Sequence, residues 1–351
     1  MRDVAIVSFA QSRSVRRDPY RNEVEILMPV VREAVERSGI PQKEIGFTCS
    51  GSSDYLAGQP FSFVMALDAI GAWPPIRESH VEMDGAWALY EAWVRLQHGD
   101  IDSALVYGFG KSSPGEIRDI LCLQLDPYYL APLWPDSISL AALQARALLE
   151  ERGLSERDLA EVAVRNRRNA KDNPNAHVAG DFSVDAILAE PYVASPLRRH
   201  DCPPISDGAA AVVLAADNLA RRVCPRPAWI AGIDHRIEPH YPGLRHLTRS
   251  PSTALAAERA GVHQGPVDVA EIHAPFSHQE IILREALGLD PSTIINPSGG
   301  ALAANPIMAA GLIRIGEAAR QIIEGSAERA VAHATSGPLL QQNLVCVLEA
   351  R

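Results

Sequence analysis

Three short segments of the chain carry polar side chains whose types suit carbonyl chemistry. They are EIHAPFSHQEI with His273, NPSGGALAANPIMAAG with Asn305, and AHATSG with His333 and Ser336. A neutral imidazole at His273 can donate a hydrogen bond to a developing oxyanion or exchange a proton. The Asn305 amide cannot exchange a proton near neutral pH, but its NH2 group can donate to a substrate carbonyl. The structural alternatives are a histidine that caps a strand end and a simple Asn-Pro turn.

Two acidic residues, Glu82 and Asp84, stand just before a predicted helix over 85–98. Carboxylates in a first helical turn accept hydrogen bonds from free backbone N–H groups, which lowers their pKa values and makes them poor acids. Burial of the Glu82 carboxylate in a pocket would raise its pKa instead and allow base chemistry. The sequence is compatible with both interpretations.

The elements that position these residues occur twice in the chain. AVERSGIPQKEIGFTCSGSS, from Ala34, aligns with AAERAGVHQGPVDVAEIHAP, from Ala256. GAWALYEAWVRLQHGDIDSALVYGFG, from Gly85, aligns with GLIRIGEAARQIIEGSAERAVAHATS, from Gly311. Each segment contains a helix that ends at a glycine and then a strand. A repeat at this spacing indicates two copies of one structural unit.

Local patterns support an α/β fold. Helices are predicted over 23–38 and 85–98, where apolar residues recur every three or four positions and a glycine follows. Apolar runs such as SALVYGF and AAAVVLA are typical of strands covered on both faces. We expect one half over 1–226 and a second over 227–351, with an inserted loop domain at about 112–197 in the first half.

The composition argues against several functional classes. The net charge of -10 without a basic block argues against nucleic-acid binding. No apolar run approaches the roughly 18 residues that a membrane span needs, and MRDVAIVSF lacks the order of a secretory signal, so we expect a cytoplasmic protein without membrane insertion. The five cysteines are scattered and include no CxxC pair, which indicates neither a disulfide framework nor a metal site.

The order of the motifs resembles that of the thiolase superfamily along nearly the whole chain. NRRNAKDNPNAH and PLRRHDCPPISDGAAAVVLA are similar to the middle of thiolase-like lipid-transfer proteins of the sterol-carrier-protein type. EIHAPFSHQEI is similar to their Asn-Glu-Ala-Phe or His-Asp-Cys-Phe element, and NPSGGALAANPIMAAG to the element that contains Gly-His-Pro. The resemblance implies a duplicated thiolase fold, with two βαβαβαββ halves in α-β-α-β-α layers.

Against that family pattern, the three acyl-transfer groups of thiolases are missing. The nucleophilic cysteine lies three residues before the glycine that matches Gly85, which puts Glu82 in its place. The histidine base is matched by Asn305, and the second cysteine falls in AHATSG, where the chain has none. Because both nucleophile and base are gone, covalent thiolysis is not expected. His273 occupies the position of the family residue that holds an oxyanion-binding water.

Lipid-transfer-protein-like aldolases, which cleave steroid side chains by a retro-aldol reaction, also lack that cysteine and histidine. The resemblance therefore implies a carbon–carbon lyase for a β-hydroxyacyl-CoA, with CoA as part of the substrate and no tightly bound cofactor. Such a step needs a base and donors for an enolate, but no cysteine. These aldolases use tyrosines, for which the chain offers Tyr241 in IEPHYPGLRHL, close to where relatives contact substrate.

The resemblance also implies binding partners. The family often binds the phosphates of CoA at the inserted region, where this chain has Arg165, Arg168, Arg198 and Arg199. Asp54 and Tyr55 occupy a loop that reaches toward a dimer partner in the family, although ordinary turn chemistry also explains them. We expect a homodimer, or a heterodimer with a thiolase-like paralogue, and a small zinc-ribbon/OB-fold partner protein. The alternative function is a non-catalytic subunit, or an acyl-CoA or lipid carrier, that supports an active paralogue.

Overall fold

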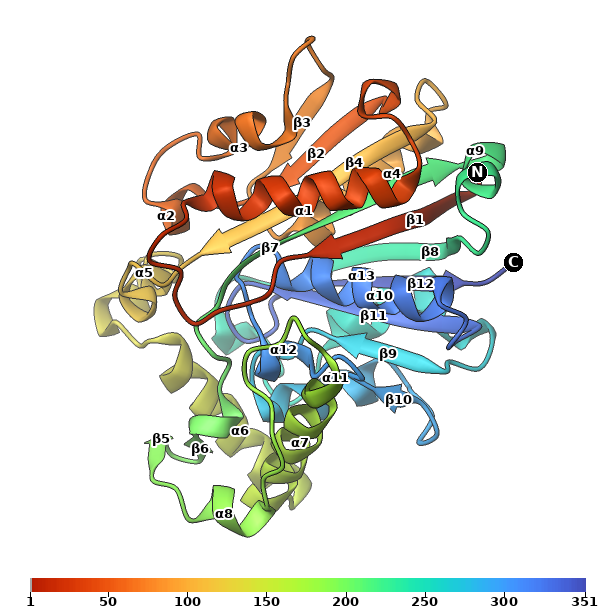
Figure 1. Ribbon diagram of the computed structural model, residues 1–351. Coiled ribbons are helices and arrows are strands. Elements are labelled where there is room, and N and C mark those ends of the chain that lie inside the picture. Colours follow the sequence, from red (N-terminus) through yellow and green to blue (C-terminus); the bar gives the residue numbers. More distant parts are fainter. Residues whose placement is uncertain (1) are drawn as a thin grey trace.

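The computed structural model describes residues 2–351, and its first half alternates strands with helices (Figure 1). The elements of this half that build the core are β1 (Val4–Gln11), α1 (Glu23–Ser38), β2 (Phe47–Gly51), α2 (Asp54–Ala57), α3 (Phe63–Ile70), β3 (Glu78–Val81), α4 (Gly85–Gln97), β4 (Ser103–Lys111), β7 (Asp207–Ala216) and α9 (Asp217–Val223). Those of the second half are β8 (Ala228–Ile237), α10 (Pro251–Ala260), β9 (Val269–Ile272), α11 (Ser277–Ala286), β10 (Ile294–Ile295), α12 (Gly300–Ala303), α13 (Ala310–Ile323), β11 (Arg329–Ser336) and β12 (Gln342–Glu349).

These strands form one 10-stranded sheet in the order β10-β9-β11-β12-β8-β1-β7-β4-β2-β3. From the centre outward, β1-β7-β4-β2-β3 repeats β8-β12-β11-β9-β10, and β1 pairs antiparallel with β8 where the halves meet. Equivalent elements therefore occupy equivalent places, which confirms the predicted duplication of a βαβαβαββ unit. The division into domains at 226/227 stays a prediction, because both halves contribute strands to the same sheet.

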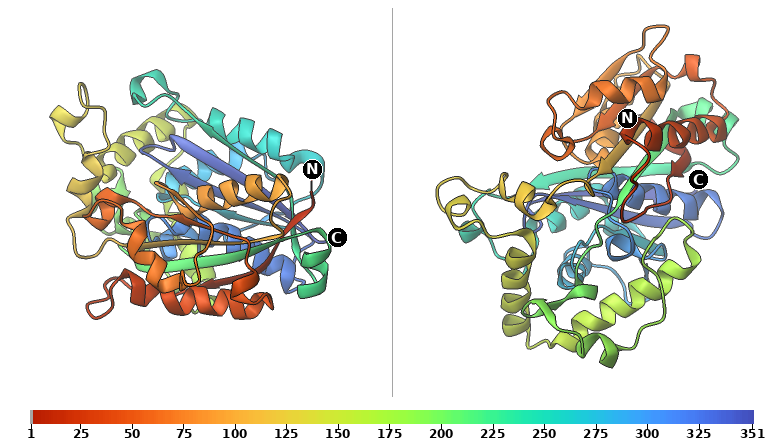
Figure 2. Two further views of the ribbon diagram at one scale, coloured as in Figure 1. Left: turned by 90° about the horizontal axis from the view of Figure 1, so that it is seen from above. Right: turned by 60° about the vertical axis from the view of Figure 1, so that its left-hand side comes forward.

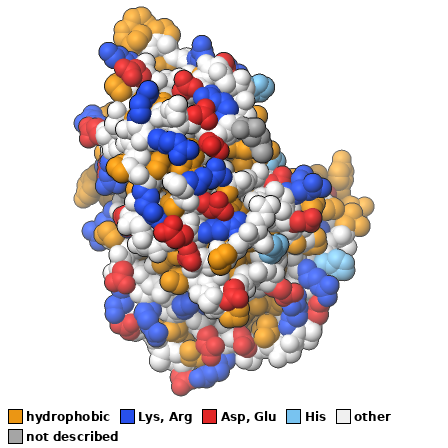
Figure 3. All heavy atoms as spheres, turned by 90° about the vertical axis from the view of Figure 1, so that its right-hand side faces the viewer, with side chains coloured by type: hydrophobic (Ala, Val, Ile, Leu, Met, Phe, Trp, Pro, Cys, Tyr) orange, Lys and Arg blue, Asp and Glu red, His pale blue; other side chains and the backbone are white. Residues whose placement is uncertain are grey.

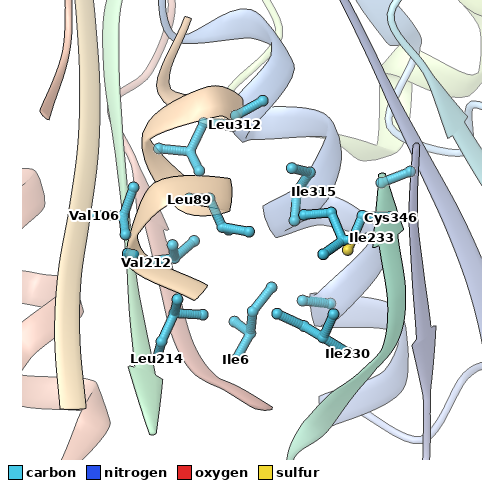
Figure 4. Packing of buried hydrophobic residues seen from close by; sticks show 14 of the residues in the cluster. Ile6, Leu89, Val106, Val212, Leu214, Ile230, Ile233, Leu312, Ile315 and Cys346 are labelled. Atoms are coloured by element: carbon cyan, nitrogen blue, oxygen red, sulfur yellow. The ribbon is translucent and has the colours of Figure 1, made fainter. Parts of the chain in front are cut away.

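The helices form three layers around the two halves of the sheet. α4 and α13 pack against each other in the middle, α1 and α3 cover the outer face of the first half, and α10 and α11 cover that of the second. Figure 4 shows side chains from both halves that meet in the middle layer, among them Ile6, Leu89, Val212, Leu312, Ile315 and Cys346. The predicted α-β-α-β-α layering is thus confirmed.

The inserted region lies between β4 and β7 and packs on the second half of the molecule (Figure 2). It contains α5 (Ile117–Cys122), α6 (Ser137–Arg152), α7 (Glu156–Asn169), α8 (Val184–Leu188) and the two-stranded sheet of β5 (Tyr192–Ala194) and β6 (Leu197–Arg198). α6 and α7 contact α11, and α7 also contacts α12. A segment of the first half therefore covers the end of the second half where His273 and Asn305 lie.

Local sequence signals explain the helix ends. The side chain of Asn22 accepts the Glu25 N–H, Glu25 accepts the Asn22 N–H in return, and Gly39 ends α1 with φ +67°. The predicted helix over 23–38 is confirmed to the residue, and the one predicted over 85–98 ends at Gln97. Both helices are bounded in the same way. Asn22 caps the start of α1 and Asp84 that of α4, and a glycine follows each end, Gly39 directly after α1 and Gly99 two residues after α4.

The surface carries charges of both signs on the face that Figure 3 shows. On the face in Figure 3, acidic and basic side chains are interspersed without a broad basic patch. All five cysteines are buried with free thiols: Cys49, Cys122, Cys202, Cys224 and Cys346. Between residues 2 and 351 no helix is both long and apolar enough to cross a membrane. A cytoplasmic location stays a prediction.

Candidate active site

A cavity of about 270 Å³ lies between the inserted region and the core, a size near the lower end of small-ligand pockets. Most of its wall is apolar and comes from α5, α6 and nearby loops: Ile117, Leu121, Leu125, Ile138, Leu140, Ala141, Pro203, Ile205, Phe276, Leu339 and Leu340. Its polar lining includes Tyr55, Asp84, His273, Asn305, Thr335 and Ser336. The fold therefore brings four predicted site residues, Asp84, His273, Asn305 and Ser336, to one cavity.

His273 and Asn305 form a hydrogen-bonded pair in this lining. His273 follows the end of β9, Asn305 lies between α12 and α13, and His273 Nε2 is 3.1 Å from Asn305 Oδ1. The backbone N–H of Thr335 donates to His273 Nδ1 at 3.4 Å. Because this N–H can only donate, Nδ1 must accept, and the proton of the neutral ring is on Nε2. His273 therefore donates to Asn305 Oδ1, which leaves the Asn305 NH2 group to donate to a ligand.

The protonation state of His273 follows from its burial. Burial lowers the pKa of His273 to about 3, although the hydrogen bond to Asn305 acts in the opposite direction. The ring is neutral at physiological pH, and the Thr335 N–H and the Asn305 amide engage both of its nitrogens. Neither predicted role of His273, donation to an oxyanion or proton exchange, fits this geometry, because both ring nitrogens are engaged. Its geometry suits holding the Asn305 amide in place.

Asp84 is buried, with 2% of its surface exposed, and joins the starts of α4 and α13. Its Oδ1 accepts the N–H groups of Ala86 at 2.8 Å and Leu312 at 3.0 Å, and its Oδ2 accepts that of Gly311 at 2.9 Å. Burial raises the pKa of Asp84, and the three backbone N–H groups oppose that rise. Three of its lone pairs are thereby used, and one on Oδ2 remains. The carboxylate is both the predicted helix cap and part of the cavity lining.

A buried ion pair behind the cavity holds the segments that carry His273 and Asn305. Arg314 of α13 lies 2.8 Å from Glu271 of β9, and both side chains are almost fully buried. Glu271 also accepts the backbone N–H of Ser298 at 2.9 Å and its hydroxyl at 2.7 Å. One carboxylate thus links β9, the turn before α12, and α13, which fixes the two ends of the His273–Asn305 pair.

Two glycines of β4 let the turn with Asn305 approach the sheet. A Cβ on Gly110 would lie 1.8 Å from the carbonyl oxygen of Ile307, and one on Gly108 would lie 2.5 Å from that of Met308. The Met308 carbonyl in turn accepts the N–H of Gly85 at 2.8 Å. Any side chain on β4 at these positions would push the turn off the sheet.

We expect Gly110→Ala to destabilise the protein by about 3 kcal/mol, because the added methyl group overlaps backbone that cannot move aside. The free energy of unfolding in urea measures this cost. Gly115→Ala is the control, because its Cβ would meet only the flexible end of the Ile120 side chain at 2.8 Å in an exposed loop. A change within about 0.5 kcal/mol is expected there. Equal losses in both variants would contradict the proposed close approach.

Glu82, Tyr241 and His333 do not line the cavity, contrary to the expectation from sequence. Glu82 is about half exposed and accepts the Asp54 N–H at 2.6 Å, so it ties two loops together at the surface. The Tyr241 ring packs 5.2 Å from that of Tyr129 on the outside of the inserted region.

His333 is fully buried within β11, outside the cavity lining. Its Nε2 lies 3.0 Å from Asn343 Oδ1, and burial lowers the pKa of His333 to about 4. Ser336, three residues later on the same strand, does line the cavity. Thr335 and Ser336, the last two residues of β11, both line the cavity, whereas His333 lies further back along the strand.

The four arginines predicted to bind CoA phosphates also lie outside the cavity lining. Arg165 pairs with Glu280, Arg168 lies 3.9 Å from Asp181, and Arg198 lies 2.6 Å from Glu156. Arg199 is exposed. Nearby carboxylates thus pair with three of the four cations, and the binding of CoA phosphates by these arginines at the inserted region stays a prediction.

Tyr55 is the tyrosine that lines the cavity, where Tyr241 was expected. It lies in α2, is 37% exposed, and its hydroxyl is 3.4 Å from Gln124 Oε1. The sequence placed it in a loop that family members use near a pocket, and that position was its only signal. The neighbouring Asp54 accepts the N–H groups of Phe61 and Ser62, both at 2.8 Å, as a turn residue does.

Comparison with known proteins finds relatives over most of the chain, although no protein-family model matches it. Benzoylsuccinyl-CoA thiolase subunit BbsB of Thauera aromatica is 29% identical over 58% of this chain and 60% of that protein. Acetyl-CoA acetyltransferase of Methanothermobacter thermautotrophicus is 33% identical over 57% and 58%, and sterol carrier protein 2 of Gallus gallus is 26% identical over 89% and 64%. The chain thus aligns with less than two thirds of the length of each.

Two solved structures share the fold. The Ltp2-ChsH2(DUF35) aldolase matches with a TM-score of 0.82 and 18% identity, over 99% of this chain and 98% of that one. The Bacillus anthracis acetyl-CoA acetyltransferase matches with a TM-score of 0.82 and 18% identity, over 100% and 99%. At these identities the likeness shows that the chain has the same fold as both.

Proposed function

Because the chain belongs to the thiolase superfamily and is similar to its lipid-transfer proteins, we propose that it is a carbon–carbon lyase that cleaves a β-hydroxyacyl-CoA by a retro-aldol reaction. A steroid side chain is the first candidate substrate. The observation that carries the proposal is the Asn305 NH2 group, oriented by His273 in an apolar cavity whose described lining residues include no cysteine. A fixed donor of this kind stabilises an enolate oxygen.

In the proposed step a base takes the proton of the β-hydroxyl group, the Cα–Cβ bond breaks, and its electron pair moves into the thioester enolate. The enolate oxygen accepts an N–H of Asn305. We assign the base to Asp84, since it is the one carboxylate among the described lining residues and burial raises its pKa. A proton then adds to Cα, for which Tyr55 is the proposed donor because it is the one tyrosine among the described lining residues. The products are a ketone or aldehyde and a shorter acyl-CoA.

The test is to purify the chain with the proteins encoded beside it and to add a β-hydroxyacyl-CoA with a steroid side chain. We expect a ketone and a short acyl-CoA in equal amounts, detected by liquid chromatography and mass spectrometry. Straight-chain β-hydroxyacyl-CoA substrates of several lengths serve as comparison. Absence of cleavage for all of them, with and without the partner proteins, would reject the lyase.

A second candidate is a non-catalytic subunit, or an acyl-CoA or lipid carrier, that supports an active thiolase-like paralogue. It is favoured by the absence of a free lone pair on His273, and one relative is itself named a subunit. Under either function we propose a homodimer or a heterodimer with that paralogue, and a small zinc-ribbon/OB-fold partner. Activity of the paralogue that depends on this chain, but survives loss of Asn305, would favour the subunit.

A further inference from the structure

The cavity contains one cation among its described lining residues, and that cation already has a partner. Arg118 of α5 forms an ion pair with Asp136, the residue that caps α6 by accepting the Ser139 N–H at 2.7 Å. The Asp136 side chain is 19% exposed and that of Arg118 is 51% exposed. No free positive charge in the described lining is therefore left for a carboxylate on the acyl group of a substrate.

The ion pair also closes a loop that forms one wall of the cavity. The loop runs from Arg118 to Asp136, and two more contacts join its two ends. Trp134 Nε1 donates to Asp119 Oδ1 at 3.1 Å. Cys122 Sγ lies 3.5 Å from the Pro135 carbonyl oxygen. Leu121, Leu125 and Pro135 on the inner side of this loop line the cavity. Arg118 thus lies at the base of an apolar wall, within reach of a bound acyl chain.

We propose that the cavity selects uncharged, apolar acyl groups, and that Asp136 is a specificity-determining residue because it keeps Arg118 from pairing with substrate carboxylates. The inference rests on the proposed function only in taking a CoA thioester as the ligand. A carboxylate that entered this apolar cavity would lose its hydration and find no free partner, which disfavours its binding. If Arg118 were released, it could form a bidentate pair with such a group.

The test compares two thioesters of equal chain length, octanoyl-CoA and octanedioyl-CoA, whose acyl groups end in a methyl group and in a carboxylate. Isothermal titration calorimetry of the whole protein should give a Kd at least about tenfold lower for octanoyl-CoA, which corresponds to about 1.4 kcal/mol. Asp136→Asn keeps a good helix cap and removes the charge. We expect it to tighten octanedioyl-CoA binding about tenfold and to leave octanoyl-CoA binding within about twofold.

Arg118→Gln is the matched control. It should not tighten octanedioyl-CoA binding, and in combination with Asp136→Asn it should abolish the gain. If Asp136→Asn fails to fold, the comparison of the two thioesters with the wild type still tests the inference. Equal affinity of the wild type for both thioesters, or a gain that persists in the double variant, would overturn the inference. If the protein prefers octanoyl-CoA but shows no cleavage activity, only the proposed lyase function is rejected. If it binds neither thioester, the lyase function and the selectivity inference are both rejected.

Discussion

Replacing Asn305 with alanine is expected to lower kcat for retro-aldol cleavage by about 10²- to 10³-fold, which is the usual loss when one oxyanion donor is removed. The expectation follows from geometry. The Thr335 N–H fixes the tautomer of His273, His273 holds Asn305 Oδ1, and the amide NH2 group is thereby fixed as a donor. Asn305 is 8% exposed, so water cannot easily replace the lost donor. Steady-state kinetics with the best substrate measures the loss.

Two further variants separate this role from a structural one. Asn305→Asp keeps the shape and the acceptor for His273 but lacks the NH2 group, so we expect a loss at least as large as for alanine. His273→Ala should cost less in the wild type, and almost nothing more once Asn305 is alanine, because His273 acts only through Asn305. Full activity of Asn305→Asp, or additive losses in the double variant, would reject Asn305 as the donor.

The sequence predicted the fold because the fold is repetitive. Each half must bury both faces of its strands, so the same strand pattern recurs in FTCSGS and VAEIHA, and their alignment identifies equivalent elements. The helix over 23–38 was predictable from its cap and its glycine, which are local signals. His273 and Asn305 were identified as site residues by their match to motifs of the family that the chain resembles, and both line the cavity.

The misplaced site residues depend on features that are not local. His333 and Ser336 share one strand, but only its last two residues, Thr335 and Ser336, reach the cavity, and the sequence does not show where along the strand the cavity lies. Tyr241 and Tyr55 could not be ranked from sequence, because the path of the inserted region decides which loop faces the cavity. Glu82 was matched to a family position by spacing, whereas Asp84, two residues later, makes the helix cap and lines the cavity. Distance along the chain could not show which carboxylate would turn inward.

Acid should destabilise this protein steeply, because three fully or largely buried histidines remain neutral in the folded state. Burial lowers the pKa of His273 and His278 to about 3 and that of His333 to about 4. In the unfolded chain these histidines take up protons below about pH 6.5. Between that pH and the folded-state pKa values the unfolded state binds more protons, so stability falls as pH falls. Each histidine lowers the free energy of unfolding by up to about 1.4 kcal/mol per pH unit, and the three together by up to about 4 kcal/mol per pH unit.

Urea unfolding between pH 7 and pH 4.5 measures this slope, and one histidine can be removed without touching the cavity. His278 of α11 is fully buried and its Nε2 lies 3.0 Å from Gln144 Oε1, a hydrogen bond that His278→Gln can replace. Its loss should reduce the slope below pH 6 by about 1.4 kcal/mol per pH unit. His98→Gln, at the exposed position after α4, should leave the slope unchanged.

Two buried carboxyl groups oppose this fall in stability, because burial raises the pKa values of Asp84 and Glu271. They bind more protons in the folded state than in the unfolded state between their raised pKa values and the unfolded-state values of about 4. An unchanged slope in His278→Gln would mean that the buried imidazole already gains its proton in the folded state.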